Sequence, residues 1–462
     1  MRSQKAIAWF LTIGDLLLLY GALFTVIALR YGGLERVNLL RQHYVPFSII
    51  FGIWIMVFVA SGLYDLHFNK NNKYFLYRLL RAAAVNTVIA ILIFYLFLPV
   101  LTIEPRRNLL LISFFSTLFI FSWRYLFNLL ILKTPPTRLL FFGANKEALE
   151  LADYLLKNPQ LRQMPTAFMA ANGEIETQPR PPALPSIIPY FANTTALSRI
   201  ASDYAIDTIV VLREIKENRT FLNMLFQVVP LGISVVEFPT FFEMISGKIP
   251  LSLIGEVWFL ENLVGIRKRY YEFFKRMLDV AVAGLMSIPA TLLFPFIAAA
   301  IKLDSEGPIF YRQRRVGRNG QKFWLIKYRS MVKDAEKMGG YKGKELDPRH
   351  TNVGTILRRS YLDELPQIIN IIKGEMSFVG PRPERPEYVN YLKEKIPFYE
   401  MRLLVPPGIT GWAQTRMEDD ASVEDAPEKM QYDLYYIKNR SPILDLLIIL
   451  KTAATVLRRQ GR

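Results

Sequence analysis

Four long apolar stretches occupy the first part of the chain, at about residues 7–29, 45–63, 82–100 and 109–132. Each is close to the roughly 20 residues that a helix needs to cross about 30 Å of hydrocarbon. The first stretch is longer than the apolar part of a signal peptide and has no small-residue cleavage site, which favours a retained membrane helix. The pattern therefore predicts a four-helix transmembrane domain over residues 1–134.

The pattern then changes to that of an α/β protein. The apolar run Leu139–Phe142 precedes Gly143 and a helical pattern at 147–156, which is typical of a β-turn-α start. Further buried strands are predicted at Thr208–Leu212 and Ile233–Phe238. A dinucleotide-binding turn needs three glycines, and only Gly143 stands here. We therefore predict a Rossmann-like soluble domain over residues 135–266, without an evident cofactor site.

The last part of the chain, residues 267–462, is predicted to be a mainly helical catalytic domain with one membrane-embedded segment. The uncharged run Val280–Ile301 is long enough to cross a bilayer, but it contains Pro289 and Pro295, and each proline removes a backbone donor and bends a helix. A full crossing would also separate the domain after it from the α/β domain. Basic residues flank the run on both sides. We predict a re-entrant helix at about 276–302 that meets anionic headgroups.

The amino-acid composition excludes several kinds of catalytic and metal site. The chain has no cysteine and three scattered histidines, His43, His67 and His350, which excludes disulfides, thiolate nucleophiles and His-based metal cages. The formal charge of +17 accompanies a mean hydropathy of +0.20, which favours anionic lipid or phosphorylated ligands over nucleic acid. Catalysis is therefore expected to use carboxylates, Arg, Lys or hydroxyls, with no nucleic acid as partner.

Basic residues near the apolar stretches indicate the orientation of the chain. Eight lysines and arginines lie on the side of the N-terminus and five on the other side. This difference favours both ends in the cytoplasm. Asp15, inside the first stretch, is interpreted as a packing residue rather than a functional one.

An acidic pair is the first candidate for chemistry. Asp363 and Glu364 follow Arg358 and Arg359, and Pro366 comes two residues later. Proline suits the first turn of a helix, so the carboxylates are expected at or just before the positive helix end. That placement and the nearby arginines predict an ionised Asp363. An ionised carboxylate can bind Mg²⁺ or attack phosphorus.

Two further motifs strengthen the argument that the acidic pair has a chemical role. The run Gly374–Pro383 places Arg382 between two prolines, which predicts a rigid loop with one bidentate phosphate donor. The run Pro407–Gln414 adds the ring of Trp412 and the amide of Gln414, both suited to a nucleotide base. Cations follow the apolar run at Arg312, Arg314, Arg315, Lys327 and Arg329. Together these features predict a phosphate site at a membrane surface.

The runs Asp363–Gln367, Phe378–Pro383 and Pro407–Gln414 resemble, in order and spacing, the bacterial sugar transferase family of polyprenyl-phosphate sugar-1-phosphate transferases. The resemblance covers roughly residues 270–462. With the preceding membrane helices and Rossmann-like domain, the chain is similar to the large form of that family in exopolysaccharide and capsule assembly.

The resemblance implies a reaction in which a UDP-sugar gives its sugar-1-phosphate to undecaprenyl phosphate and UMP leaves. Asp363 would be the nucleophile of an aspartyl-phosphosugar intermediate and a ligand of Mg²⁺, and Glu364 would assist it. The substrate-binding residues expected are Arg358, Arg382, Lys327, Arg329 and Gln414. The membrane helix would break at Ser287, Pro289 and Pro295, although the family usually has an adjacent Ser-Pro and Ile288 intervenes here.

Two alternatives stay open from the residues. A metal-dependent glycosyltransferase, with Asp363 or Glu364 as base, would release UDP. A non-enzymatic membrane scaffold would use the α/β domain for self-association. The resemblance places the enzyme in the bacterial inner membrane with the active site on the cytoplasmic face, and we expect a homodimer. Several sugars, among them glucose, galactose and N-acetylated sugars, fit the sequence as donors.

Overall fold

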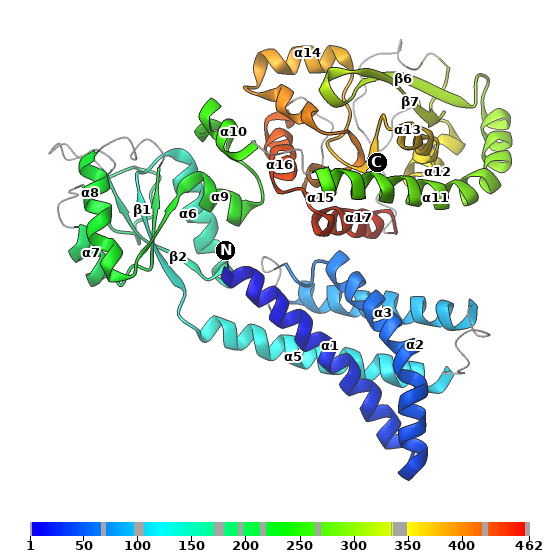
Figure 1. Ribbon diagram of the computed structural model, residues 1–462, viewed down its shortest axis with the longest axis horizontal. Coiled ribbons are helices and arrows are strands. Elements are labelled where there is room, and N and C mark those ends of the chain that lie inside the picture. The colour runs from blue at the N-terminus through cyan, green and yellow to red at the C-terminus, as the bar shows by residue number, and fades with distance from the viewer. Residues whose placement is uncertain are drawn as a thin grey trace. The chain divides into compact units, whose positions relative to one another are not determined.

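The computed structural model divides the chain into two compact units, Met1–Met244 and Ile245–Arg462. It describes residues 2–65, 71–96, 106–170, 180–192, 197–212, 219–263, 269–333, 335, 349–417 and 424–457. The first unit holds the apolar helices and a parallel sheet (Figure 1). The second unit holds all the predicted catalytic residues.

Four long helices lie at the four apolar stretches, and each is long and apolar enough to cross a membrane. They are α1 (Arg2–Arg30), α2 (Gly33–Ala60), α3 (Lys73–Leu96) and α5 (Arg106–Lys133). Helix α1 packs against α2 and α5, and α3 also packs against both. Helices α2 and α3 begin before the predicted apolar stretches, because helical hydrogen bonding continues through polar residues that hydropathy alone leaves out.

Asp15 lies at the centre of a buried ion pair in these helices. Its carboxylate accepts hydrogen bonds from Nε and Nη2 of Arg124 and from the hydroxyl of Tyr64, and Nη1 of Arg124 donates to the carbonyl of Leu63. Both charged side chains are almost fully buried. Because both oxygens of the carboxylate have partners, the structure supports the interpretation of Asp15 as a packing residue.

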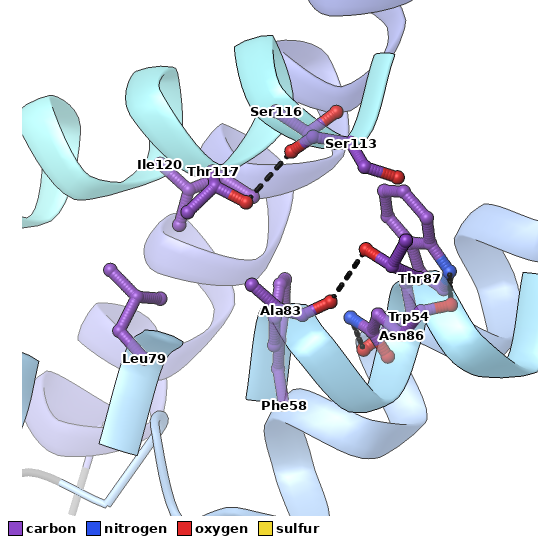
Figure 2. Close-up of a pocket in the computed structure, with 10 residues that line it drawn as sticks. All are labelled: Trp54, Phe58, Leu79, Ala83, Asn86, Thr87, Ser113, Ser116, Thr117 and Ile120. Carbon is purple, nitrogen blue, oxygen red and sulfur yellow. Dashed lines mark hydrogen bonds between the residues drawn. The ribbon is translucent and has the colours of Figure 1, made fainter. Parts of the chain in front are cut away.

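A small pocket lies between α2, α3 and α5 (Figure 2). Its volume is about 10 Å³, and buried oxygens of Asn86, Ser113 and Ser116 face it without a partner among the described residues. Thr87 and Thr117 bond back to carbonyls of their own helices. Small and hydroxylated residues of this kind are typical of helix contacts in membranes. The pocket is far too small for a nucleotide sugar.

The α/β domain has a five-stranded parallel sheet of order β3-β2-β1-β4-β5. Its strands are β1 (Thr137–Phe142), β2 (Gln163–Met169), β3 (Tyr190–Phe191), β4 (Thr208–Val211) and β5 (Ser234–Glu237), and its helices are α6 (Lys146–Lys157), α7 (Leu197–Asp203), α8 (Arg219–Val228) and α9 (Phe238–Ser246). Helices α7 and α8 pack on one face of the sheet, and Phe241 of α9 contacts Phe141 of β1. The predicted strands β1, β4 and β5 are confirmed, and so is a membrane protein with an α/β domain.

In the turn after β1, a side chain caps the start of helix α6. Gly143 follows β1 with φ +98°, which permits the tight turn. The side chain of Asn145 then accepts a hydrogen bond from the backbone N–H of Ala148, at the start of α6. One backbone donor that a phosphate would use is thereby occupied.

The second unit combines short strands with many helices. Its first elements are α10 (Glu256–Leu263), α11 (Arg269–Asp304), β6 (Phe310–Val316), β7 (Lys322–Tyr328), α12 (Asn352–Arg359), the 3-10 helix η7 (Leu362–Gln367) and α13 (Ile368–Lys373). They are followed by β8 (Ser377–Val379), α14 (Pro386–Lys395), η8 (Tyr399–Leu404), β9 (Gly408–Thr410), α15 (Trp412–Arg416), α16 (Ala426–Asn439) and α17 (Pro442–Leu457). Ile249, Trp258 and Leu263 precede the predicted domain boundary at 266, yet they belong to the core of this unit.

Helix α11 continues through both prolines but changes direction, as its ribbon shows (Figure 1). Ala283 packs in a cluster with Leu325, while Ile301 packs in a cluster with Tyr328. A straight helix would separate Ala283 from Ile301 by about 27 Å, whereas Leu325 and Tyr328 lie about 10 Å apart along β7. The bend lets both parts of the helix contact one short strand. The predicted break is thus a bend within one helix, and the re-entrant path stays a prediction.

Candidate active site

The acidic pair sits in the first turn of a helical segment. Tyr361 has φ +57°, an uncommon conformation for a residue with a side chain, and the 3-10 helix η7 begins immediately after it. Asp363 and Glu364 are therefore inside the first turn, and Pro366 lies further along than the sequence predicted. The positive end of a helix stabilises negative charge at this place.

Asp363 is a buried carboxylate among cations. Its side chain is 8% exposed, and the part of the chain that the structure describes offers it no hydrogen bond or ion pair. Burial raises its pKa to about 6, while Lys327, Arg358 and Arg382 oppose that rise and Glu364 adds to it. The sequence predicted that the arginines would decide the charge. Burial has the larger effect, although a group with this pKa is still mainly ionised at pH 7.

Glu364 has two cationic partners. Nζ of Lys327 lies 2.6 Å from its Oε1, and Nη2 of Arg382 lies 3.7 Å from the same atom. Burial alone would raise the pKa of Glu364, but Lys327, Arg382 and Arg358 together lower it. Glu364 is thus the more acidic member of the pair, and it holds two cations beside Asp363.

The loop after β8 holds Arg382 in a fixed backbone. Nη2 of Arg402 donates to the carbonyl of Arg382 at 3.0 Å, and Nη1 of Arg315 donates to the carbonyl of Pro383 at 2.9 Å. A side chain at Gly380 would come within 2.3 Å of the carbonyl oxygen of Pro406, so only glycine fits there. These contacts support the rigid loop predicted from the sequence, and its role as a phosphate donor stays a prediction.

A network of charged side chains contacts this loop. Glu384 Oε1 is 2.6 Å from Nζ of Lys429, and Arg402 and Arg315 each approach the Glu384 carboxylate to 3.8 Å. Burial alone would raise the pKa of Glu384, but Lys429, Arg402 and Arg315 outweigh it and lower the pKa to about 2. Arg402, which is 3% exposed, also pairs with Asp433 at 2.8 Å. The sequence did not single out Glu384 or Arg402 as site residues.

Arg358 comes from the last turn of α12. Its Nη1 lies 3.1 Å from Nε2 of His350, and its charge acts on both carboxylates of the pair. Gly354 of the same helix lies directly against the backbone of Ser330, where a Cβ would be 2.0 Å from the carbonyl oxygen. Close packing of this helix therefore sets the position from which Arg358 reaches the acidic pair.

Arg329 and Trp412, which the sequence suggested as substrate contacts, make contacts within the protein instead. Arg329 is 6% exposed and donates to the carbonyls of Ile301, Ser305 and Glu306 at the end of α11. It thus ties down the end of that helix. The ring of Trp412, 3% exposed, stacks on Tyr435, and its Nε1 donates to a backbone carbonyl. The sequence suggested this ring for a nucleotide base, but it is part of the core.

The second motif loop runs beside the first. Strands β8 and β9 pair in parallel, with Ser377 opposite Gly408 and Val379 opposite Thr410. Gln414, in the first turn of α15, donates through Nε2 to the carbonyl of Ile409 at 3.2 Å. Its Oε1 is buried without a partner among the described residues. The structure therefore brings the Phe378–Pro383 and Pro407–Gln414 runs together.

A metal ion at this site would need ligands from the substrate as well as from the protein. The described residues contain no group of three or more Asp, Glu, His or Cys side chains that could hold a metal ion. Mg²⁺ commonly takes one or two carboxylates together with substrate phosphates and water. Asp363, which has no hydrogen-bond partner among the described residues, suits that arrangement, whereas Glu364 is occupied by Lys327. The residues present fit a Mg²⁺ ion shared with a diphosphate.

Comparison with known proteins places this site in a family. A family model described as bacterial sugar transferase matches residues 270–459. A UDP-N-acetylgalactosamine-undecaprenyl-phosphate N-acetylgalactosaminephosphotransferase of Aeromonas hydrophila is 39% identical over 46% of this chain and 50% of its own length. A UDP-glucose:undecaprenyl-phosphate glucose-1-phosphate transferase of Xanthomonas campestris is 41% identical over 41% of this chain and 40% of its length. The chain thus spans half or less of these two relatives.

Other relatives are covered more fully. The UDP-glucose:undecaprenyl-phosphate glucose-1-phosphate transferase of Caulobacter vibrioides is 38% identical, over 40% of this chain and 69% of its own length. Among solved structures, a UDP-D-quinovosamine 4-dehydrogenase of Vibrio fischeri matches 25% of this chain and 88% of its own, at 16% identity. Its TM-score of 0.18 is too low to support a conclusion.

Proposed function

Because this chain belongs to the bacterial sugar transferase family, we propose that it transfers a sugar-1-phosphate from a UDP-sugar to undecaprenyl phosphate in a membrane, with release of UMP. The observation that carries the proposal is the Asp363 carboxylate, which is buried, has no hydrogen bond among the described residues and is surrounded by three cationic side chains. A carboxylate kept free of protein partners in a cationic site is suited to attack an anionic phosphoryl group.

The proposed reaction proceeds in two displacements at the sugar-bearing phosphorus. In the first, an oxygen of Asp363 forms a bond to this phosphorus, and the bond to the bridging oxygen breaks. The bridging oxygen leaves with UMP, and an aspartyl-phosphosugar remains. In the second, a phosphate oxygen of undecaprenyl phosphate attacks the same phosphorus and releases the Asp363 carboxylate. No net proton transfer is required, which suits a site whose reactive groups are carboxylates and cations.

The side chains around Asp363 have separate tasks in this scheme. Arg382 and Arg358 bind phosphate oxygens and offset the charge that spreads over them in the transition state. Lys327 is held by Glu364 at 2.6 Å and adds a third positive charge. Mg²⁺, if shared by Asp363 and the diphosphate, would supply further positive charge to the phosphoryl oxygens. Gln414, with its buried and unpartnered Oε1, is proposed to contact the donor.

The membrane requirement supports the same reaction. A long isoprenoid keeps its phosphate at headgroup depth, so the catalytic unit must contact the bilayer. Helix α11 presents exposed apolar side chains such as Tyr270, Phe273, Leu285, Leu292 and Phe296. We propose that α11 enters and leaves one leaflet, with the active site on the cytoplasmic face of a bacterial inner membrane. A homodimer and a role at the start of exopolysaccharide or capsule synthesis belong to the same proposal.

The test is a nucleotide-release assay on the full chain in lipid nanodiscs, with undecaprenyl phosphate, Mg²⁺ and a panel of UDP-sugars. We expect UMP that requires the lipid, is lost with EDTA and returns with Mg²⁺. Asp363→Asn should abolish turnover because an amide cannot form the intermediate, and Glu364→Gln should lower it strongly. Asp153→Asn is the matched control, because Asp153 forms an exposed pair with Lys157 on α6.

The alternatives give different products. UDP in place of UMP would identify a glycosyltransferase that moves the sugar alone. Normal turnover of Asp363→Asn would refute the nucleophile assignment. A protein that releases neither nucleotide from any donor would point to a membrane scaffold.

A further inference from the structure

Asn370 is a buried polar residue inside the apolar helix α13. It is completely buried, and its side-chain amide makes three hydrogen bonds. Oδ1 accepts from the backbone N–H of Ile326 at 3.2 Å, and Nδ2 donates to the carbonyl of Trp324 at 2.8 Å and to Oε2 of Glu375 at 2.7 Å. Two of the three bonds therefore end on strand β7.

These two bonds occupy the place of a neighbouring strand. Strand β6 pairs with one edge of β7. In an antiparallel pair, alternate residues direct their backbone groups to opposite edges, so Ile326 and Trp324 use the same edge. Asn370 accepts from one and donates to the other, as the backbone of one residue in a third, parallel strand would. Beneath this bridge, Leu325 of β7 packs in one cluster with Ile371 of α13.

Lys327 follows directly after the bridge. It shares a face of the strand with Leu325, and its Nζ lies 2.6 Å from Oε1 of Glu364. Asn370 and the acidic pair belong to one continuous helical segment, residues 362–373. The amide thus links the strand that carries Lys327 to the helix that carries Asp363.

We propose that Asn370 is a positioning residue that fixes Lys327 against the acidic pair. The inference rests on the proposed function, because it assigns Asn370 a task in that reaction. A lysine side chain is long and flexible, so the strand backbone decides where its ammonium group can act. A displacement of about 1 Å in a catalytic constellation can cost on the order of a hundredfold in rate.

The test separates the rate of the first displacement from the amount of folded enzyme. Rapid mixing with an active UDP-sugar, without undecaprenyl phosphate, should give one UMP per active site in a burst. In Asn370→Ala we expect the burst to be about tenfold slower or more, with its amplitude kept. Asn439→Ala is the matched control, since Asn439 is exposed and its amide donates to a carbonyl of its own helix; its burst should be normal.

A second variant keeps the test decisive if Asn370→Ala fails to fold. Asn370→Asp has the same size and keeps the acceptor for Ile326, but it loses the donor to Trp324, so its burst should also be slow. Lys327 is then labelled with an amine reagent in each protein and quantified by mass spectrometry. Labelling should be faster in both Asn370 variants than in the wild type, because the pair with Glu364 is less firmly held.

Unchanged labelling of Lys327 in both variants would overturn the inference. So would a burst of reduced amplitude but normal rate, because that result would mean only a loss of folded protein. A wild-type chain that forms no UMP would instead refute the proposed function. In that case the labelling comparison would still decide whether Asn370 positions Lys327.

Discussion

Replacing Glu384 by glutamine should destabilise the second unit, because it removes a carboxylate that faces Lys429, Arg402 and Arg315. Glutamine has the same size, so the change removes charge and little packing. The backbone carbonyl of residue 384, which accepts a hydrogen bond from Val316, is retained. The loop that carries Arg382 should therefore keep its path while its charge balance changes.

The magnitude follows from the shift in pKa. Lys429 and the two arginines lower the pKa of Glu384 from 4.5 to about 2. A difference of about 2.5 units corresponds to about 3.4 kcal/mol of stability at pH 7. This value is an upper limit, because the desolvation of the partner cations offsets part of it.

The dependence on pH has a defined sign. The folded pKa of Glu384 lies below the unfolded one, so its contribution is fully present above pH 4.5 and is lost as the pH falls toward 2. The difference between wild type and Glu384→Gln should thus be about 0.8 kcal/mol smaller at pH 4 than at pH 7.

Urea unfolding of the full chain in nanodiscs, followed by tryptophan fluorescence, measures this difference. Glu400→Gln is the control, because Glu400 forms an exposed pair with Lys393 and should contribute about 0.5 kcal/mol. Equal stabilities for the two variants at pH 7 would refute the reasoning. A difference that grows on acidification would refute it as well.

Two further predictions concern buried carboxylates. Because the pKa of Asp363 is raised to about 6, the rate of the UMP burst should fall about tenfold per pH unit below pH 6. The free-energy cost of holding this carboxylate ionised in the folded protein should also be relieved as the pH falls from 6 toward 3.8. Burst rates at pH 4.5 to 8 test the first expectation, and a constant rate down to pH 5 would contradict it. Asp15→Asn should destabilise the first unit by about 3–5 kcal/mol, because it leaves the Arg124 guanidinium buried without a counter-ion; thermal unfolding in nanodiscs measures the loss, and an unchanged midpoint would argue against the ion pair.

The candidate site was predictable where a motif is short and continuous in the chain. Asp363, Glu364 and Arg382 were found from their neighbours, because proline and glycine restrict the backbone wherever they occur. Arg329 was predicted as a phosphate ligand on its charge alone, and its actual partners are the carbonyls at the end of α11. Asn370 was passed over, although a single polar residue in an apolar helix is a signal that it has hydrogen-bond partners.

The sequence by itself determined the membrane helices, strands β1, β4 and β5, and the acidic pair, because apolar length, periodicity and local motifs need no information about distant residues. Only the tertiary structure decided which cations meet which carboxylates, and that Trp412 lies in the core. It also decided the pKa of Asp363. The arginines near this residue in sequence favour its charge, but burial opposes it, and burial depends on every segment that packs around the side chain.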